Sequence, residues 1–255
     1  MSSLIVESEH NVFISSMWGE RRSATHQAPS SNDSERNTQH QISIPILMYH
    51  EVGEGPNNLF VPNLDFYAQM KYLQENGYQT ITLAQASIML AARQDTSKKV
   101  VLTFDDGCAS FYHDALPVLD EMHQTATFFI ISDLVDAPGY VTWEQVEKLS
   151  NLGIEIGGHT KTHPLLAQID PLFLDSEIAG NKKDIEAKTA LKITSFCYPS
   201  GSYSPQVVAK VKEAGYTAAV TMEPGMASSE NDPFLLPRWG VLNKEPLRIF
   251  INHIQ

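Results

Sequence analysis

The stretch "KVVLTFDDG" (99–107) indicates how this chain folds, because it joins an apolar run to two acidic residues and a glycine. Residues 99–104 form a continuous apolar run, as expected for a strand that is buried on both faces. Such strands occur in parallel sheets that helices cover on both sides. Directly after this strand, the carboxylates of Asp105 and Asp106 would repel each other unless each has a different partner.

Strand-like and helical segments alternate on both sides of this stretch. The strand-like segments are 42–50, 78–83, 126–131, 154–159, 193–199 and 216–221, and the helical ones are 64–77, 84–93, 115–123, 142–153, 172–190, 205–215 and 246–254. This alternation predicts an α/β fold with parallel strands, either a barrel or a doubly wound sheet. In both architectures the functional groups gather at the C-terminal ends of the strands.

Composition and length favour one folded domain behind an N-terminal extension. The chain has 255 residues, of which 42% are hydrophobic, enough for one sizeable core. Residues 22–41 are polar and lack an apolar period, so we expect a disordered segment over 1–41 and one domain over 42–255. No run reaches the ~18 apolar residues of a membrane span. Glu7 and Glu9 occupy the place of the basic region of a secretory signal, which leaves the compartment open.

Charge and cysteine content narrow the choice of partners. A net charge of −12 makes a nucleic-acid partner unfavourable, since phosphate backbones would be repelled. The two cysteines, Cys108 and Cys197, are too few for a disulfide framework. They are either two small buried thiols or a single disulfide, and the chain is expected to be a monomer.

Polar residues follow the predicted strands at five places along the chain. They are His50 with Glu51, then Asp105 with Asp106, then His159 and His163, then "CYPSGSY" (197–203) with Ser200, and last Arg238 in "LPRW" (236–239). Because the carboxyl ends of parallel strands share one rim, we expect these side chains to lie together.

The two histidines indicate a metal site. His159 and His163 are four residues apart, so a helical turn would bring both imidazoles onto one face to share an ion. Two histidines and one carboxylate make a three-ligand site with open positions, which is typical of catalytic metals. Consecutive side chains on an extended segment diverge, so one aspartate can ligate the ion while the other serves as general base for a water molecule. Gly107 would let the backbone turn sharply there.

"TFDDG" (103–107), followed by "HTKTHP" (159–164), resembles the first two motifs of the polysaccharide deacetylases, the NodB-homology or carbohydrate esterase family four proteins. The resemblance covers about residues 42–242. It implies a distorted (β/α) barrel of about seven parallel strands and the metal-dependent removal of N-acetyl, sometimes O-acetyl, groups from sugars. It further implies Asp105 as base, Asp106, His159 and His163 as ligands of a metal that is usually Zn2+, and an acetylated polysaccharide as partner.

The third motif departs from that family's pattern. In "FCYPSG" (196–201), Cys197 stands where the family has arginine and Ser200 where it has an aromatic residue. The family's oxyanion donor at the last position is a backbone amide, which Ser200 still supplies. Arg238 could orient Asp105 in place of the missing arginine; the alternative is a surface salt bridge.

The family's C-terminal Leu-x-His motif, whose histidine is the general acid, is absent. His253 in "FINHIQ" (250–255) reads as a helix residue instead. "MYHEVGE" (48–54) resembles the N-terminal segment of the biofilm poly-N-acetylglucosamine deacetylases, and "FYAQMKYLQENGYQTITLAQA" (66–86) also looks like that subgroup. The resemblance therefore implies that His50 protonates the leaving amine; the alternative is a rim histidine bonded to Glu51.

Other functions remain compatible with the sequence. The same site could act on a small non-sugar amide, although Tyr198, Tyr203 and Trp239 could stack on sugar rings. The altered third motif also suits a degenerate, non-catalytic sugar-binding protein. A magnesium-binding phospho-acceptor receiver domain would have an aspartate pair, but it would lack the histidine pair and be shorter. The polymer, the metal and the compartment stay open.

Overall fold

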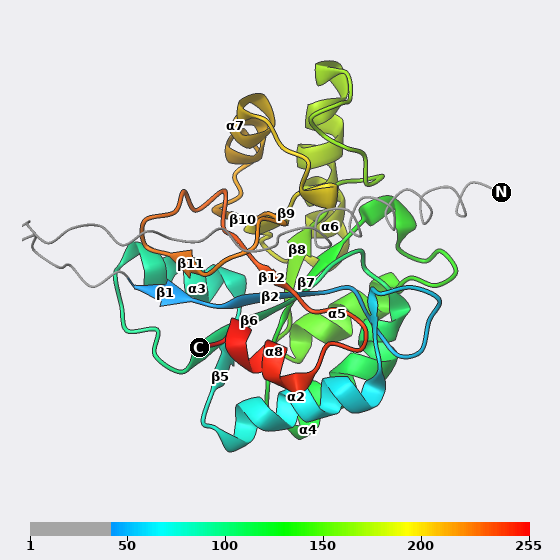
Figure 1. Cartoon of the computed structure of the whole chain (residues 1–255). Coiled ribbons are helices and arrows are strands. Elements are labelled where there is room, and N and C mark those ends of the chain that lie inside the picture. The colour runs from blue at the N-terminus through cyan, green and yellow to red at the C-terminus, as the bar shows by residue number, and fades with distance from the viewer. Residues whose placement is uncertain (1–41) are drawn as a thin grey trace, which may run out of the picture. The chain divides into compact units, whose positions relative to one another are not determined.

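The computed structural model describes residues 42–255 (Figure 1). The predicted disorder of residues 1–41 lies outside the described residues. The core of the fold is a parallel sheet with seven strands in the continuous order β10-β9-β8-β7-β6-β2-β12, and β5 pairs with the first half of β6. This curled half-barrel confirms the predicted α/β class.

The strands are short. In spatial order they are β10 (Ala218–Val220), β9 (Ser195–Cys197), β8 (Glu155–Gly158), β7 (Thr127–Ile130), β6 (Lys99–Phe104), β2 (Ile46–Tyr49), β12 (Trp239–Gly240) and the branch strand β5 (Gln79–Ile81). Two small pairs lie outside this sheet: antiparallel β1 (Ser43–Ile44) with β11 (Ala227–Ser228), and parallel β3 (Glu51–Val52) with β4 (Phe60–Val61).

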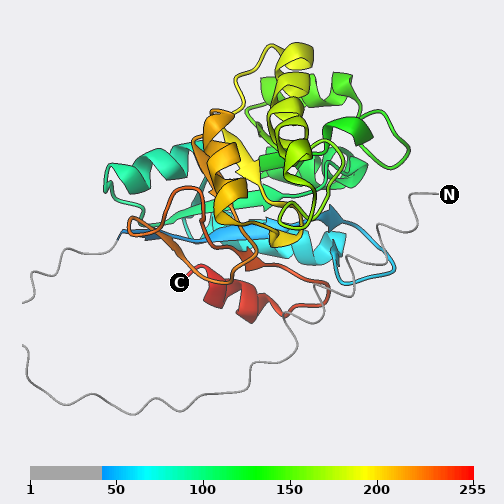
Figure 2. The same ribbon diagram turned by 90° about the horizontal axis from the view of Figure 1, so that it is seen from above.

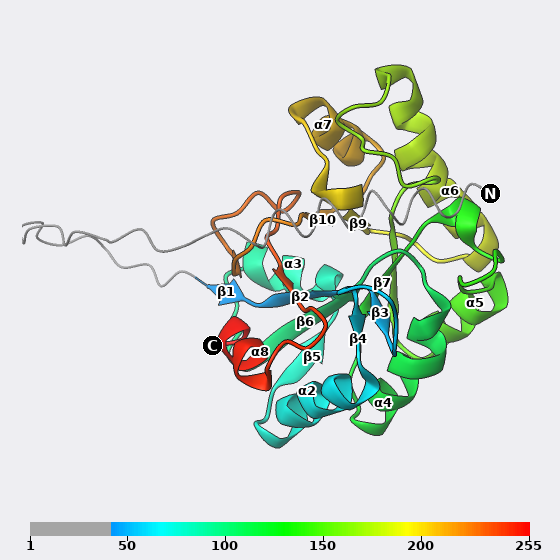
Figure 3. The ribbon, with the colours of Figure 1, turned by 45° about the vertical axis from the view of Figure 1, so that its right-hand side comes forward.

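Helices pack around the strands (Figure 3). The α-helices are α2 (Asn63–Glu75), α3 (Leu83–Ala91), α4 (Leu116–Glu121), α5 (Trp143–Asn151), α6 (Asn181–Thr189), α7 (Pro205–Glu213) and α8 (Leu247–His253). Shorter turns are the π-helices η1 (Phe111–Ala115) and η4 (Ser176–Gly180) and the 3-10 helices η2 (Ser132–Leu134), η3 (Pro171–Phe173) and η5 (Pro199–Gly201). Figure 2 shows the yellow and orange helices on one side of the strands and the red α8 on the other.

Strand β6 has the both-face burial that its apolar run predicts. Leu102 and Phe104 belong to the larger hydrophobic cluster, which lies between the sheet and the surrounding helices. Val101 belongs to a second, smaller cluster that also contains Phe129 and Cys197 of neighbouring strands. Side chains alternate along a strand, so Thr103 and Asp105 face the same side as Val101. The strand thus delivers Asp105 to the inside of the half-barrel.

Helix α3 packs against the N-terminal ends of the strands, so the C-terminal ends remain available for functional groups. Its first amides are anchored by the first residues of two strands: Leu83 N donates to Thr127 Oγ1 (2.9 Å) and Ala84 N to Glu155 Oε2 (3.1 Å). These two hydrogen bonds supply acceptors for amides at the helix N-terminus that would otherwise lack partners. The apolar face of α3 packs into the smaller hydrophobic cluster. The N-terminal ends of the strands are therefore structural, as in barrel enzymes.

The segment before and within β12 links both edges of the sheet. Leu236 forms a parallel bridge with Val220 of β10, and Trp239 pairs with Leu47 of β2. No strand was predicted here, because β12 has only two residues and too short an apolar pattern. Its consequence is that Arg238 lies between the two edges and faces the interior, where it is fully buried.

The predicted long helix 172–190 consists of three different pieces. It starts as η3, where Pro171 opens the turn and the Asp170 side chain accepts from Leu172 N (3.0 Å). It continues through the π-helix η4 and ends as α6, with Ala190 in the left-handed conformation (φ 54°). Apolar periodicity identifies helical character but does not distinguish these helix types.

Candidate metal centre and catalytic site

The two carboxylates after β6 have different partners because the chain turns between them. Asp105 N donates to Tyr49 O (3.0 Å) and extends the β2–β6 ladder by one residue. Asp106 and Gly107 then adopt positive φ values of 74° and 81°. Asp105 consequently meets Arg238, whereas Asp106 meets the two histidines. The left-handed turn produces the divergence that was expected from simple alternation along an extended segment.

Asp106, His159 and His163 bring three metal-ligating atoms together. Asp106 Oδ1 lies 3.3 Å from His159 Nε2 and 3.5 Å from His163 Nε2. All three donor atoms lie within 4.8 Å of one another. In a tetrahedral zinc site with ligand distances of about 2.1 Å, donors stand about 3.4 Å apart. The donor set and its spacing therefore fit a divalent metal.

The orientation of His159 suits a metal ligand. Its Nδ1 lies 2.8 Å from the carbonyl oxygen of Cys197, which can only accept a hydrogen bond, so Nδ1 carries the proton. The lone pair of Nε2 then points toward Asp106. In metal-bound histidines, a hydrogen bond from the other ring nitrogen fixes the ring orientation in the same way. The backbone N–H of His159 also donates to Ile130 O (3.1 Å), which ties the residue to β7.

The prediction that a helical turn joins the two histidines is wrong. Residues 159–165 contain no helix. Instead, Thr160 and His163 both have φ 63°, and His163 N donates to Thr160 Oγ1 (2.9 Å). Left-handed backbone is uncommon for residues other than glycine, and such conformations cluster at functional sites. A tight loop, not a helix face, brings the imidazoles to a ring separation of 4.8 Å.

Arg238 and Asp105 form a buried, bidentate ion pair. Its NH1 lies 2.8 Å from Oδ1 and its NH2 2.8 Å from Oδ2. Further donations from Arg238 go to Thr221 O (2.8 Å) and Thr103 Oγ1 (2.9 Å). The surface salt bridge considered from the sequence is thus excluded. Burial alone would raise the pKa of Asp105, but the charge and hydrogen bonds of Arg238, with smaller contributions from His50 and His159, lower it overall.

We expect Arg238→Gln to destabilise the fold by about 3–5 kcal/mol, because it leaves the carboxylate of Asp105 buried without its counter-charge. Urea denaturation followed by circular dichroism measures the change. The control is Arg93→Gln, which breaks the exposed pair with Glu230 and should cost less than about 1 kcal/mol. Equal losses in the two variants would show that the buried pair is not a stability determinant.

A second group of potential ligands, Asp105, His159 and Cys197, is a poor cation site. The guanidinium of Arg238 already occupies it, with NH2 3.2 Å from Cys197 Sγ and bonded to Asp105. A cation placed there would be repelled by this charge. Burial also raises the pKa of the Cys197 thiol, which favours the protonated form over the ligating thiolate. Cys108 and Cys197 do not form a disulfide.

His50 follows β2 and Ser200 follows β9, two strands that are separated in the sheet by β6, β7 and β8. β2 and β6 pair with Tyr49 opposite Phe104, so the next residue, His50, follows beside Asp105. His50 is 5% exposed and its charge helps to lower the pKa of Asp105. Ser200 has φ 51° within η5, the turn that follows β9. His50, Asp105, Asp106 and His159 thus follow strand ends, whereas Arg238 immediately precedes β12.

The aromatic residues proposed to stack on sugar are mostly engaged elsewhere. Tyr198 is buried, and its hydroxyl donates to Phe234 O (3.1 Å). The Trp239 ring stacks on His253 of α8, with centroids 4.8 Å apart and planes 2° apart. His253 therefore lies in a helix, as expected. Tyr203 is partly exposed, as is Trp239, and its ring lies against that of Tyr198.

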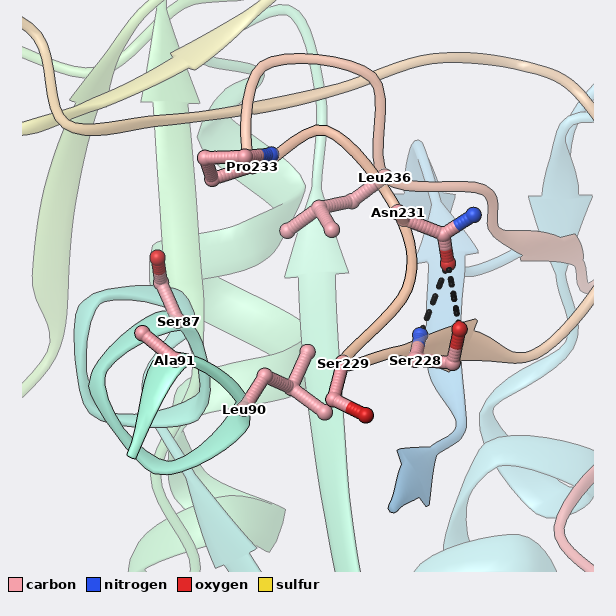
Figure 4. A pocket seen from close by; sticks show the side chains of 8 residues that line it. All are labelled: Ser87, Leu90, Ala91, Ser228, Ser229, Asn231, Pro233 and Leu236. Carbon is pink, nitrogen blue, oxygen red and sulfur yellow. Dashed lines mark hydrogen bonds between the residues drawn. The ribbon is translucent and has the colours of Figure 1, made fainter. Parts of the chain in front are cut away.

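A cavity lined by none of these site residues is shown in Figure 4. It has a volume of about 150 Å³ and lies between α3 and the chain that follows β11. Leu90 and Leu236 line it, together with Ser228 and Asn231, whose Oδ1 accepts from Ser228 N (2.8 Å) and Oγ (3.1 Å). No titratable side chain lines it, so it offers no acid, base or metal ligand.

Sequence reasoning missed the residues behind the histidine loop. Glu177 and Asn181 contact the backbone of residues 160–162, and Thr103 supports Arg238. The available signal for Asn181 was a polar residue at a position of the 172–190 helix that turns out to be fully buried. Glu177 carried no signal, because charged residues are common on exposed helix faces.

Comparisons with known proteins agree with this geometry. Residues 92–219 match the family described as polysaccharide deacetylase. YxkH of Bacillus subtilis (strain 168), named as a polysaccharide deacetylase, is 39% identical over 202 residues, covering 79% of this chain and 72% of YxkH. The Streptococcus pyogenes deacetylase PplD, solved in complex with acetate, superimposes with a TM-score of 0.81 at 26% identity, covering 84% of this chain and 99% of PplD.

The match to a biofilm-type relative is weaker. The poly-beta-1,6-N-acetyl-D-glucosamine N-deacetylase of Escherichia coli (strain K12) is 26% identical over 231 residues. The alignment covers 73% of this chain but only 34% of that protein, so the chain spans about a third of its length. Among residues 42–255, the helices are too short or too polar to cross a membrane.

Proposed function

This chain belongs to the polysaccharide deacetylase family, enzymes that hydrolyse carbon–nitrogen bonds, and we propose that residues 42–255 are a catalytic domain that removes N-acetyl groups from an N-acetylglucosamine-type polysaccharide. The observation that carries this proposal is the convergence of Asp106, His159 and His163 beside the buried Asp105–Arg238 pair. A metal-binding triad next to an oriented carboxylate can supply an activated water and a general base, which suits the hydrolysis of an amide.

Asp106, His159 and His163 would hold the divalent metal, for which we propose zinc because two imidazoles and one carboxylate suit it. When bound, such a metal lowers the pKa of water and polarises a carbonyl group. Asp105 would accept the proton of the attacking water. Arg238 keeps Asp105 ionised and fixes both of its oxygens, so the carboxylate is ready to accept.

Ser200 and His50 complete the proposed set. The backbone N–H of Ser200, in the left-handed turn after β9, would donate to the carbonyl oxygen as negative charge develops there. His50, beside Asp105, would donate its proton to the departing nitrogen, because an amine anion is too poor a leaving group to depart unprotonated. The proposed relation to the biofilm poly-N-acetylglucosamine deacetylases also rests on this role of His50.

The direct test measures metal content and acetate release from the full chain. We expect about one divalent metal per chain and release of acetate from N-acetylglucosamine oligomers, with β-1,6-linked and chitin-type oligomers compared. Release from small non-sugar amides alone would favour an amidohydrolase, and oligomer binding without release would indicate a non-catalytic sugar-binding protein. Either result overturns the proposed substrate or activity.

His50→Ala should slow acetate release from the oligomers by about 100- to 10,000-fold, the usual contribution of a general acid. The same variant should hydrolyse 4-nitrophenyl acetate nearly as well as the wild type, because that leaving group departs without a proton. His253→Ala, in α8, is the matched control and should keep wild-type rates on both substrates. A parallel loss on both substrates in His50→Ala would argue against the role of acid.

A further inference from the structure

The loop that carries both histidines is held from behind by the helix that follows it in the chain. Glu177 Oε2 accepts from Lys161 N (3.0 Å) and Thr162 N (2.9 Å), and its Oε1 accepts from Thr162 Oγ1 (2.8 Å). Hydrogen bonds to an ionised carboxylate are stronger than those between neutral groups. One partly buried side chain therefore binds two consecutive loop amides, midway between the two proposed metal ligands.

Asn181 holds the start of the same loop. It is fully buried, and its Nδ2 donates to Thr160 O (2.6 Å) and Ile130 O (3.2 Å). The Ile130 carbonyl also accepts from His159 N, so one amide group joins the loop to the end of β7. The close approach requires glycine at 158, where a Cβ would lie 2.5 Å from Asn181 Oδ1.

Glu177 and Asn181 reach the loop together because of their spacing. They are four residues apart across the junction of η4 and α6, and residues at this spacing lie on the same face of a helix. Single π turns within helices are often found at functional sites. The two side chains hold the loop through backbone groups of residues 160–162, through the hydroxyl of Thr162, and through the carbonyl of the neighbouring Ile130.

The loop needs such support. Thr160 and His163 both adopt φ 63°, a conformation that these residue types rarely choose by themselves. Without external hydrogen bonds the loop would relax toward commoner conformations, and the two imidazoles would lose their common focus. Metal binding would then have to include the cost of reordering the loop, which lowers affinity.

We propose that Glu177 and Asn181 are positioning residues that preorganise the loop 159–163 for metal binding, an inference that rests on the metal site of the proposed function. The probe is Co2+, whose visible absorption reports coordination, titrated into the metal-free full chain in competition with a chelator. Glu177→Ala should bind Co2+ about 10-fold more weakly or worse. Substitution of residues that orient metal ligands without touching the metal has effects of this size. Glu177→Gln should bind nearly as tightly as the wild type, because its amide oxygen can accept from both loop amides.

Glu186→Ala is the matched control. Glu186 lies on α6, the helix that follows η4, and it also accepts a backbone hydrogen bond, from Ile193 N (3.0 Å), but no described hydrogen bond joins it to the histidine loop. The affinity of the Glu186→Ala variant for Co2+ should stay at the wild-type value. Asn181→Ala should weaken binding in the same direction as Glu177→Ala, although its buried position makes Glu177 the cleaner test.

Amide hydrogen exchange of the metal-free protein gives a second readout. The amides of Lys161 and Thr162 should exchange faster in Glu177→Ala than in Glu186→Ala, since only the former loses their acceptor. Wild-type binding of Co2+ together with unchanged affinity in Glu177→Ala would refute the positioning role alone. A wild-type chain that binds no Co2+ would refute the metal site and, with it, this inference.

Discussion

Asp105→Asn should lower the rate of acetate release from N-acetylglucosamine oligomers by about 100- to 10,000-fold, the contribution expected of a general base. Asparagine has nearly the shape of aspartate but cannot accept the proton of the attacking water. Because Asp105 is not among the proposed metal ligands, the variant should still bind about one divalent metal per chain. Initial rates and metal analysis of the same preparation check both expectations.

The control for Asp105→Asn must account for the buried ion pair. Asparagine removes the charge that faces Arg238, so the variant will also lose stability. Thr103→Val removes a different hydrogen bond of Arg238, the one from NH1 at 2.9 Å, and keeps the carboxylate. It should lose some stability and far less activity. If both variants release acetate at similar rates, Asp105 is not the base.

His163→Ala should lose stoichiometric metal and, with it, acetate release. Two ligands would remain of the three, and removing a direct ligand should weaken metal binding by more than the roughly 10- to 100-fold that outer-shell changes cost. Metal content after dialysis and initial rates on the oligomers provide the measurement. The exposed His113→Ala on η1 is the matched control and should retain both metal and activity.

Chelation separates the loss of metal from other effects of the substitution. Treating the wild-type chain with a chelator should abolish acetate release, and adding back Zn2+ should restore it, whereas the same addition should not rescue His163→Ala. Full activity of the chelated wild type would refute the metal-dependent mechanism.

Local sequence patterns were sufficient to predict most strands of the sheet and to nominate the candidate site residues. Residues 99–104 were predicted as a buried strand and form β6 with these bounds, because a continuous apolar run depends only on neighbouring residues. The Asp105–Asp106 pair and the two histidines could be read as a metal-binding group because parallel strands bring their C-terminal ends together. These conclusions needed no knowledge of distant contacts.

The tertiary structure alone decided how these residues are held. Asp105 and Arg238 are 133 positions apart, and only the position of Arg238 between two sheet edges shows that the pair is buried and bidentate. The loop with His159 and His163 has left-handed residues instead of the helical turn that the spacing suggested. Local preference disfavours that backbone, so it depends on contacts from distant segments, Glu177 and Asn181 among them. The sequence alone determined which side chains follow the strands. Long-range hydrogen bonds determined the backbone conformation that orients these side chains.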